Sequence, residues 1–131
     1  MYTLKTSYKK ILADTITPIQ IYLKIRDRFP NSILLESSDY HANDNSYSYI
    51  CCNPIASIAV ENAVLKASYP DGKTIETPIS SDVNVADEIR KFSEKFRVTQ
   101  QDFNFINNGL FGYIAYDAVR YFEDVSIVKK E

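Results

Sequence analysis

Hydrophobic residues recur with a helical period in the stretch 83–96 of the chain. The apolar residues that share one face of the predicted helix are Val85, Ile89, Phe92 and Phe96. Their spacing of i, i+4, i+7 and i+11 is that of an amphipathic helix with one apolar stripe. Asp82 or Asn84 precedes the stripe and has a side chain suited to a helix N-cap. The pattern therefore predicts a surface helix that packs one face on a core.

A second helical pattern begins at Thr17 and ends before Pro30. Thr17 is a suitable N-cap, Pro18 suits the first helical position, and Gln20 completes a capping box. Apolar residues follow at helical spacing, and the proline ends the pattern because it cannot continue a helix.

The remaining apolar runs are short or alternate with polar residues, as β-strands do. The ranges predicted as strands are 2–8, 32–37, 46–54 and three runs within 56–77. In the last range, Glu61-Asn62 and Pro70-Asp71-Gly72 separate the runs and predict a meander. These elements predict a single α+β domain over residues 1–131, with a mostly antiparallel β-sheet and two or more packed α-helices.

The segment 109–116, GLFGYIAY, is apolar on both faces when it is read as a strand. Strands buried on both faces lie inside layered structures, and two helices cannot cover both faces of such a sheet well. We therefore expect this segment to pack against more protein, or to form a homo-oligomer through its exposed apolar surface. The next residues predict a turn of helix in which Asp117 and Arg120, spaced i, i+3, form a surface ion pair.

Composition narrows the class of protein. The chain has 15 basic and 17 acidic residues, a formal net charge of −2 and 45% hydrophobic residues. This balance is that of a globular domain, and it lacks the basic stripe that binding to nucleic acid or an anionic membrane requires. No stretch has the length of a bilayer span, and the N-terminus lacks the apolar region of a secretory signal. We expect a cytoplasmic protein with no nucleic-acid or membrane partner.

Reactive side chains are too few and too scattered to indicate a catalytic or metal site. Cys51 and Cys52 are adjacent, and neighbours in a strand point to opposite faces, so a mutual disulfide is not expected. His41 is the single histidine, and without spaced cysteines it makes no standard zinc site. No nucleophile–base pair and no pair of carboxylates is indicated. We therefore expect no catalytic residue, metal or cofactor in this chain, and no enzymatic activity from it alone.

Two segments resemble a known enzyme family. The segment 108–123, NGLFGYIAYDAVRYFE, is similar to the glycine- and tyrosine-rich strand and the Tyr-Asp-x-Val-Arg motif in the N-terminal region of anthranilate synthase component I. The segment 33–54, ILLESSDYHANDNSYSYICCNP, resembles the Leu-Leu-Glu-Ser segment and the later Tyr-Ser-containing strand of that region. The helix predicted at 17–30 also matches the family's opening helix in position and character, so the resemblance covers nearly the whole chain.

The resemblance implies the N-terminal part of a larger, two-layered α+β enzyme, a lyase that converts chorismate to anthranilate in tryptophan biosynthesis. It implies that Mg²⁺ binds in a C-terminal catalytic region, which is missing from this sequence. It further implies that a glutamine amidotransferase subunit supplies ammonia, and that L-tryptophan is a feedback inhibitor. We expect the missing catalytic region, the amidotransferase and tryptophan to be the partners of this chain.

The resemblance also implies a regulatory tryptophan site in the Leu-Leu-Glu-Ser segment. The residues carried over to this chain are Leu35, Glu36, Ser37, Tyr47 and Ser48. Glu36 offers a carboxylate to the ammonium of the ligand, Ser37 offers a hydroxyl, and Leu35 and Tyr47 offer apolar walls to the indole. The plainer alternative is that Leu34 and Leu35 are core strand residues, and that Glu36 and Ser37 mark the exposed end of the strand.

The chain departs from the family's pattern at two places. Ser46 stands where an arginine often precedes the Tyr-Ser pair, and Cys51 and Cys52 stand where a glycine often follows it. The loss of the arginine removes a contact for the ligand's carboxylate. The alternative assignments are aminodeoxychorismate synthase component I, which often has aspartate in place of Glu36, and a stand-alone small-molecule-binding or interaction module. Glu36 favours anthranilate synthase, and the doubly apolar strand disfavours a stand-alone module.

Overall fold

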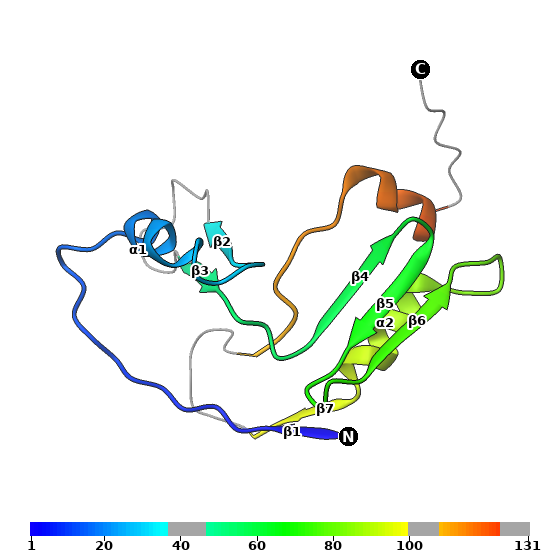
Figure 1. Cartoon of the computed structure of the whole chain (residues 1–131), viewed down its shortest axis with the longest axis horizontal. Helices are drawn as coiled ribbons and strands as arrows, with labels where there is room; N and C mark the ends of the chain where they lie inside the picture. Colours follow the sequence, from blue (N-terminus) through cyan, green and yellow to red (C-terminus); the bar gives the residue numbers. More distant parts are fainter. Residues whose placement is uncertain (37–46, 100–107, 124–131) are drawn as a thin grey trace, which may run out of the picture. The chain divides into compact units, whose positions relative to one another are not determined.

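A computed structural model describes residues 1–36, 47–99 and 108–123 of the chain (Figure 1). Contacts within the chain divide it into two compact units. Unit 1 comprises Met1–Ser7 and Ile55–Glu131, and unit 2 comprises Tyr8–Pro54. The expected single domain over residues 1–131 stays a prediction, because a division by contacts does not say whether either unit folds alone.

A three-stranded antiparallel meander forms the centre of unit 1. Its strands, in spatial order, are β4 (Ser57–Glu61), β5 (Val64–Ser68) and β6 (Thr74–Pro78). Asn62 and Ala63 form the loop between β4 and β5, and both have positive φ angles, 50° and 58°, as a type I′ hairpin turn requires. Gly72 has a φ of 81° in the next turn, where its N–H donates to the carbonyl of Tyr69 at 3.0 Å. The predicted meander is confirmed.

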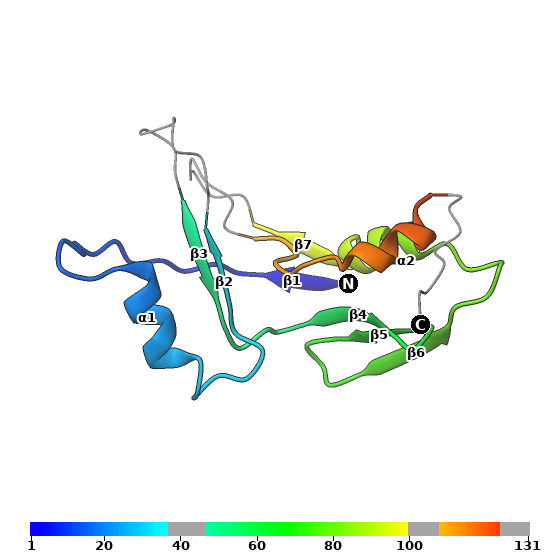
Figure 2. The same cartoon turned by 90° about the horizontal axis from the view of Figure 1, so that it is seen from above.

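Helix α2 (Val85–Ser93) packs on one face of this sheet (Figure 2). Asn84 is its N-cap, and the side-chain oxygen accepts a hydrogen bond from the N–H of Asp87 at 3.1 Å. The buried residues of the core come from this helix and from the β5 region: Leu65, Ala67, Tyr69, Val85 and Phe92. The predicted amphipathic helix is therefore confirmed, with Asn84 as its cap.

A parallel pair of short strands, β1 (Tyr2–Leu4) and β7 (Phe96–Val98), packs against this core. Tyr2 stacks on Tyr69 and Phe96, with ring centroids 5.7 Å and 5.5 Å away. Phe96 was predicted as the last apolar residue of the helix, but α2 ends before it and Phe96 begins β7 instead. The physical reason is the pairing with β1, a contact between distant parts of the sequence that no local period reveals.

Unit 2 contains one helix and a two-stranded antiparallel ribbon in its described part. These elements are α1 (Pro18–Ile25), β2 (Ile33–Glu36) and β3 (Ser48–Cys51). The predicted capping box is present, because the Thr17 hydroxyl accepts from the N–H of Gln20 and the Gln20 side chain accepts from the N–H of Thr17, both at 3.2 Å. The helix ends at Ile25, and turns and a bend over residues 26–29 lead to Pro30. No described residue of this unit is buried.

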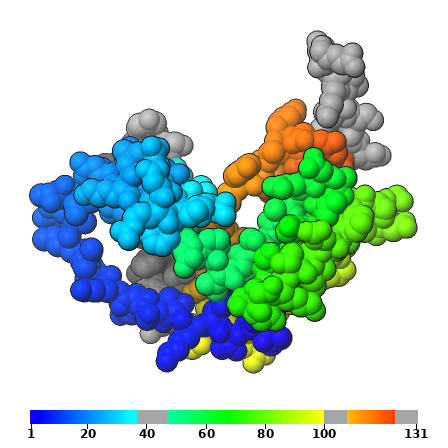
Figure 3. Space-filling model, viewed as in Figure 1, coloured from blue at the N-terminus to red at the C-terminus, as the bar shows by residue number. Residues whose placement is uncertain are grey.

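Residues 109–115 do not form the predicted strand. They run without regular structure into the 3₁₀ helix η1 (Tyr116–Tyr121), and side chains of this segment lie at the surface (orange in Figure 3). A strand exists only with a hydrogen-bonded neighbour, and none of the described strands pairs with this segment. The predicted ion pair is present in η1, where Arg120 Nη2 lies 2.6 Å from Asp117 Oδ2.

Candidate functional site

The predicted ligand-binding residues gather at one end of the β2–β3 ribbon. In the strand register, Glu36 lies opposite Ser48, and Leu35 lies one position farther into the ribbon. Glu36 and Ser48 are exposed, and Tyr47, which precedes β3, is 41% exposed. The fold thus places these four residues near one another, while Ser37 lies outside the described residues, as do Ser46 and His41.

Strand alternation divides these residues between the two faces of the ribbon. Opposed residues of an antiparallel pair share a face, and neighbours within one strand point to opposite faces. The residues that share the first face are Leu34, Glu36, Ser48 and Ile50. Leu35 shares the other face with Tyr49. The predicted carboxylate contact and the predicted apolar wall at Leu35 therefore point away from each other, which strand periodicity alone could have shown.

Glu36 presents a carboxylate that is available for a cation. It is exposed at the end of β2 and has no ion-pair partner among the residues that the structure describes. The hydroxyl of Ser48 belongs to the residue directly opposite. A carboxylate and a hydroxyl on one face form a small acidic acceptor site that suits an ammonium group.

The two thiols lie at the far end of β3 from this acceptor site. Cys51 is half-buried, Cys52 is exposed, and both are free. Burial raises the pKa of the Cys51 thiol, and the neighbouring Cys52 raises it further. A raised pKa leaves less of the Cys51 thiol in the reactive thiolate form at neutral pH.

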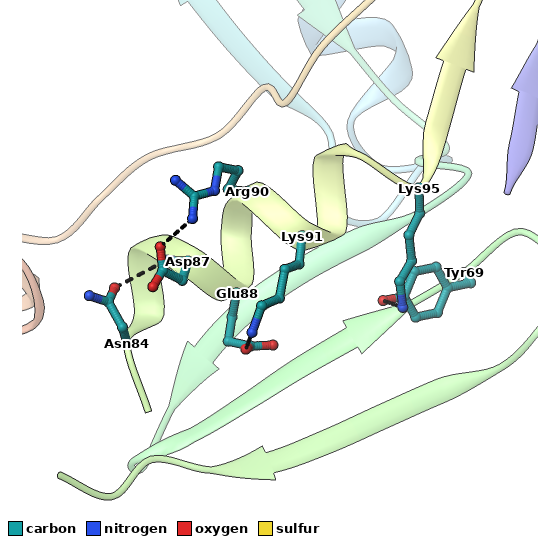
Figure 4. A network of polar contacts seen from close by, with 7 residues as sticks. All are labelled: Tyr69, Asn84, Asp87, Glu88, Arg90, Lys91 and Lys95. Carbon is teal, nitrogen blue, oxygen red and sulfur yellow. Dashed lines mark hydrogen bonds and ion pairs between the residues drawn. The ribbon is translucent and has the colours of Figure 1, made fainter. Parts of the chain in front are cut away.

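The charged residues of α2 form contacts with one another (Figure 4). The two ion pairs spaced i, i+3 are Arg90–Asp87 at 2.8 Å and Lys91–Glu88 at 2.7 Å. Just after the helix, the Lys95 ammonium donates to the hydroxyl of Tyr69 at 3.2 Å and lies 4.8 Å from the centre of its ring. These contacts stabilise the helix and the chain that follows it.

A further polar contact joins β1 to the turn between β5 and β6. The Asp71 carboxylate accepts from the N–H of Lys73 at 3.1 Å and from the hydroxyl of Tyr2 at 2.9 Å. These hydrogen bonds lower the pKa of Asp71, and the bond from Lys73 has the larger effect. The pKa of Tyr2 is raised, first by burial and then by its bond to Asp71. The contact ties the N-terminal strand β1 to the turn between β5 and β6.

Within residues 1–36, 47–99 and 108–123, no group of three or more His, Cys, Asp or Glu side chains is placed to hold a metal ion. The helices in the same described part are all too short or too polar to cross a membrane.

Most of the chain is similar to curated proteins named anthranilate synthase component 1. The protein of Pseudomonas putida is 34% identical over 113 residues, which are 86% of this chain and 22% of the relative. The protein of Aquifex aeolicus (strain VF5) is 28% identical over 128 residues, 95% of this chain and 24% of the relative. The protein of Lactococcus lactis subsp. lactis (strain IL1403) is 27% identical over 118 residues, 89% of this chain and 24% of the relative.

No protein-family model and no solved structure matches the chain. The curated relatives nevertheless confirm the resemblance that the segments 33–54 and 108–123 indicate, since all seven matching proteins carry the same name. The chain is a relative of anthranilate synthase component 1 and spans about a quarter of the length of the curated relatives that it matches.

Proposed function

We propose that this chain is the N-terminal regulatory and scaffold region of an anthranilate synthase component 1. Under this proposal, chorismate is converted to anthranilate on further polypeptide, which binds Mg²⁺ and receives ammonia from a glutamine amidotransferase subunit. This chain contributes the site at which L-tryptophan inhibits the enzyme. Similarity over 95% of the chain to the Aquifex aeolicus protein supports the assignment to this enzyme.

The main observation in support of a regulatory site is that Glu36 and Ser48 lie directly opposite each other in the ribbon. A free amino acid has an ammonium group that needs acceptors when it leaves water. Directly opposed residues of an antiparallel pair have Cβ atoms about 4.5–5.5 Å apart, so a carboxylate and a hydroxyl at these positions can share one ammonium. Because Glu36 has no competing cation among the described residues, its charge is available to the ligand.

The indole ring requires an apolar wall, and the two faces of the ribbon offer different walls. Leu35 and Tyr47 provide a wall only if the ligand wraps around the end of the ribbon, since Leu35 points away from Glu36. Ser37 follows Glu36 in the sequence and is the residue proposed to offer a hydroxyl to the polar end of the ligand. A ligand that stays on the face of Glu36 instead contacts Leu34 and Ile50, which are half-buried.

The test is calorimetric titration of L-tryptophan into the chain and into two variants. Glu36→Gln removes the charge at the proposed site, and Glu61→Gln is a matched control, because Glu61 is also an exposed glutamate at the end of a strand. We expect saturable binding to the unaltered chain and to Glu61→Gln. Binding to Glu36→Gln should be weaker by about tenfold or more, because a hydrogen bond to a charged group contributes ~1.5–3 kcal/mol.

A second ligand separates recognition of the ammonium from recognition of the indole. Indole-3-propionic acid lacks the ammonium group, so it should bind weakly and equally to the unaltered chain and to Glu36→Gln. The absence of tryptophan binding to the unaltered chain would contradict a regulatory site in this chain. Equal tryptophan affinities for all three proteins would contradict the location at Glu36.

Hydrogen exchange gives an independent location for the same site. Bound tryptophan should slow the exchange of amides in β2 and β3, because a ligand that binds the folded ribbon stabilises it against local opening. The amides of Leu65 and Ala67, in the buried core of unit 1, should be unchanged. Slowing confined to unit 1 would place the ligand elsewhere.

A further inference from the structure

We propose that Asn108 is a site of spontaneous deamidation and that its contact with Thr6 controls the rate. The proposal does not rest on the proposed function. It starts from the sequence, in which Asn108-Gly109 is the one Asn-Gly pair among the 131 residues. The backbone nitrogen of a glycine attacks a preceding asparagine side chain more easily than that of other residues, because glycine has no Cβ to obstruct the approach. The reaction is therefore encoded in two adjacent residues and requires no other protein.

The attacking nitrogen of Gly109 is accessible in the structure. Gly109 is exposed and lies with Asn108 in a bend outside the helices and strands. No described residue accepts a hydrogen bond from the N–H of Gly109. Backbone that is exposed and outside regular hydrogen bonding opens at low free energy. Gly109 can thus reach the conformation that the reaction requires while the rest of the chain stays folded.

The side chain of Asn108, in contrast, is held in place. Its Nδ2 donates a hydrogen bond to Oγ1 of Thr6 at 2.8 Å, and both residues are half-buried. This same nitrogen is the one that leaves as ammonia during deamidation. The hydrogen bond must therefore break before the reaction is completed. The contact with Thr6 should make deamidation slower in the folded chain than in the unfolded chain.

Deamidation proceeds through a cyclic succinimide. The Gly109 nitrogen gives up its proton to solvent and forms a bond to Cγ of Asn108. The bond between Cγ and Nδ2 then breaks, and the leaving nitrogen takes up a proton and departs as ammonia. Water next adds to one of the two ring carbonyls, and the ring opens to aspartate or isoaspartate. The net reaction consumes one water and releases one ammonia, and nothing is oxidised or reduced.

The two products differ in their effect on the contact with Thr6. An aspartate carboxylate can only accept, but the hydroxyl of Thr6 can also donate, so this contact persists with donor and acceptor exchanged. In isoaspartate the main chain runs through the former side-chain carbon, and the contact is lost. The contact joins two residues of unit 1 that are 102 positions apart in the sequence. Formation of isoaspartate should therefore loosen the segment Met1–Ser7 at its end.

The test is incubation of the folded chain in mildly alkaline buffer, followed by peptide mass spectrometry that locates each change from amide to acid. We expect Asn108 to convert while Asn62 remains intact. Asn62 is a matched internal control, because it is exposed in a hairpin loop and precedes Ala63, whose Cβ obstructs the attack. Thr6→Val removes the acceptor and should raise the rate at Asn108 about threefold or more, the factor expected for loss of one hydrogen bond.

Thr6→Ser retains the hydroxyl, so it should react at the rate of the unaltered chain. In concentrated urea, all three proteins should deamidate at one common, faster rate, because the contact is then absent and residues 108 and 109 are the same. Circular dichroism checks that both variants fold. Equal rates in buffer for the unaltered chain and Thr6→Val would overturn the control by Thr6. Conversion of Asn62 as fast as Asn108 would overturn the assignment of the site.

Discussion

Ala63, in the loop of the β4–β5 hairpin, has a backbone conformation that is unfavourable for alanine. It has a φ of 58°, in the left-handed region that disfavours residues with a Cβ. Asn62, with a φ of 50°, tolerates the same region because a short polar side chain can bond locally. The loop keeps this conformation because Glu61 and Val64 on either side of it are paired in the register. Ala63→Gly should therefore stabilise unit 1.

Two opposing terms set the magnitude of this effect. The left-handed conformation costs an alanine ~1–2 kcal/mol, and glycine removes this strain. Glycine also has greater conformational freedom in the unfolded chain, which lowers the free energy of unfolding by ~0.5–1 kcal/mol. Ala63 is exposed, and its carbonyl accepts from the N–H of Ile79 at 2.8 Å in either variant, so no packing or hydrogen bond is lost. The expected net gain in the free energy of unfolding is about 0.5–1 kcal/mol.

Urea unfolding followed by circular dichroism measures this gain as a higher midpoint at an unchanged slope. The matched control is Ala59→Gly, because Ala59 is an exposed alanine within β4 and opposite Lys66. There glycine relieves no strain, so the control should lose about 0.5–1 kcal/mol. Opposite signs for the two Ala→Gly changes would establish the strain at Ala63. The reasoning is refuted if both variants are destabilised by similar amounts.

Three further outcomes follow from the contacts. Asn84→Ala removes the cap of α2 and should lower the free energy of unfolding by about 1 kcal/mol, measured by urea titration. The pKa of Asp71 is lowered in the folded chain, mainly by the hydrogen bond from the N–H of Lys73. The ionised carboxylate therefore adds to stability above its ordinary pKa of 3.8, and this contribution is lost as the pH falls through the lower folded value. Asp71→Asn should flatten the acid side of the plot of stability against pH. Cys52 should react with iodoacetamide faster than Cys51, which is half-buried with a raised pKa, and peptide mass spectrometry resolves the two sites.

Elements encoded by neighbouring residues could be predicted from the sequence. The capping box at Thr17, the N-cap at Asn84 and the turn at Gly72 each depend on a few consecutive side chains, and the structure has all three. The β1–β7 pair could not be predicted in this way, since it joins Tyr2 to Phe96 across most of the chain. Its stability comes from tertiary packing, which overrides the helical period that ends at Phe96.

The residues proposed to bind the ligand follow from a resemblance as a set, but their arrangement in space depends on the strand register. Nothing in the sequence states that Glu36 lies opposite Ser48, because the register depends on the connection between the strands. The placement of Leu35 and Glu36 on opposite faces could have been predicted from the sequence, since adjacent strand residues point to opposite faces. The segment 109–116 is apolar, as its sequence shows, but the prediction that it forms a strand was wrong. A strand requires a hydrogen-bonded partner, which no local pattern supplies.

The distribution of buried residues bears on where a regulatory ligand would act. All the buried residues of the described chain lie in unit 1, and the ribbon with the proposed site lies in unit 2. A two-stranded ribbon is only marginally stable by itself, and ligand-responsive elements are commonly drawn from the least stable parts of a fold. A ligand at Glu36 and Ser48 would then bind and order the ribbon in the same step, with part of its binding free energy spent on that ordering. The affinity of the isolated chain for tryptophan should therefore be weaker than that of a protein in which further polypeptide already holds the ribbon in place.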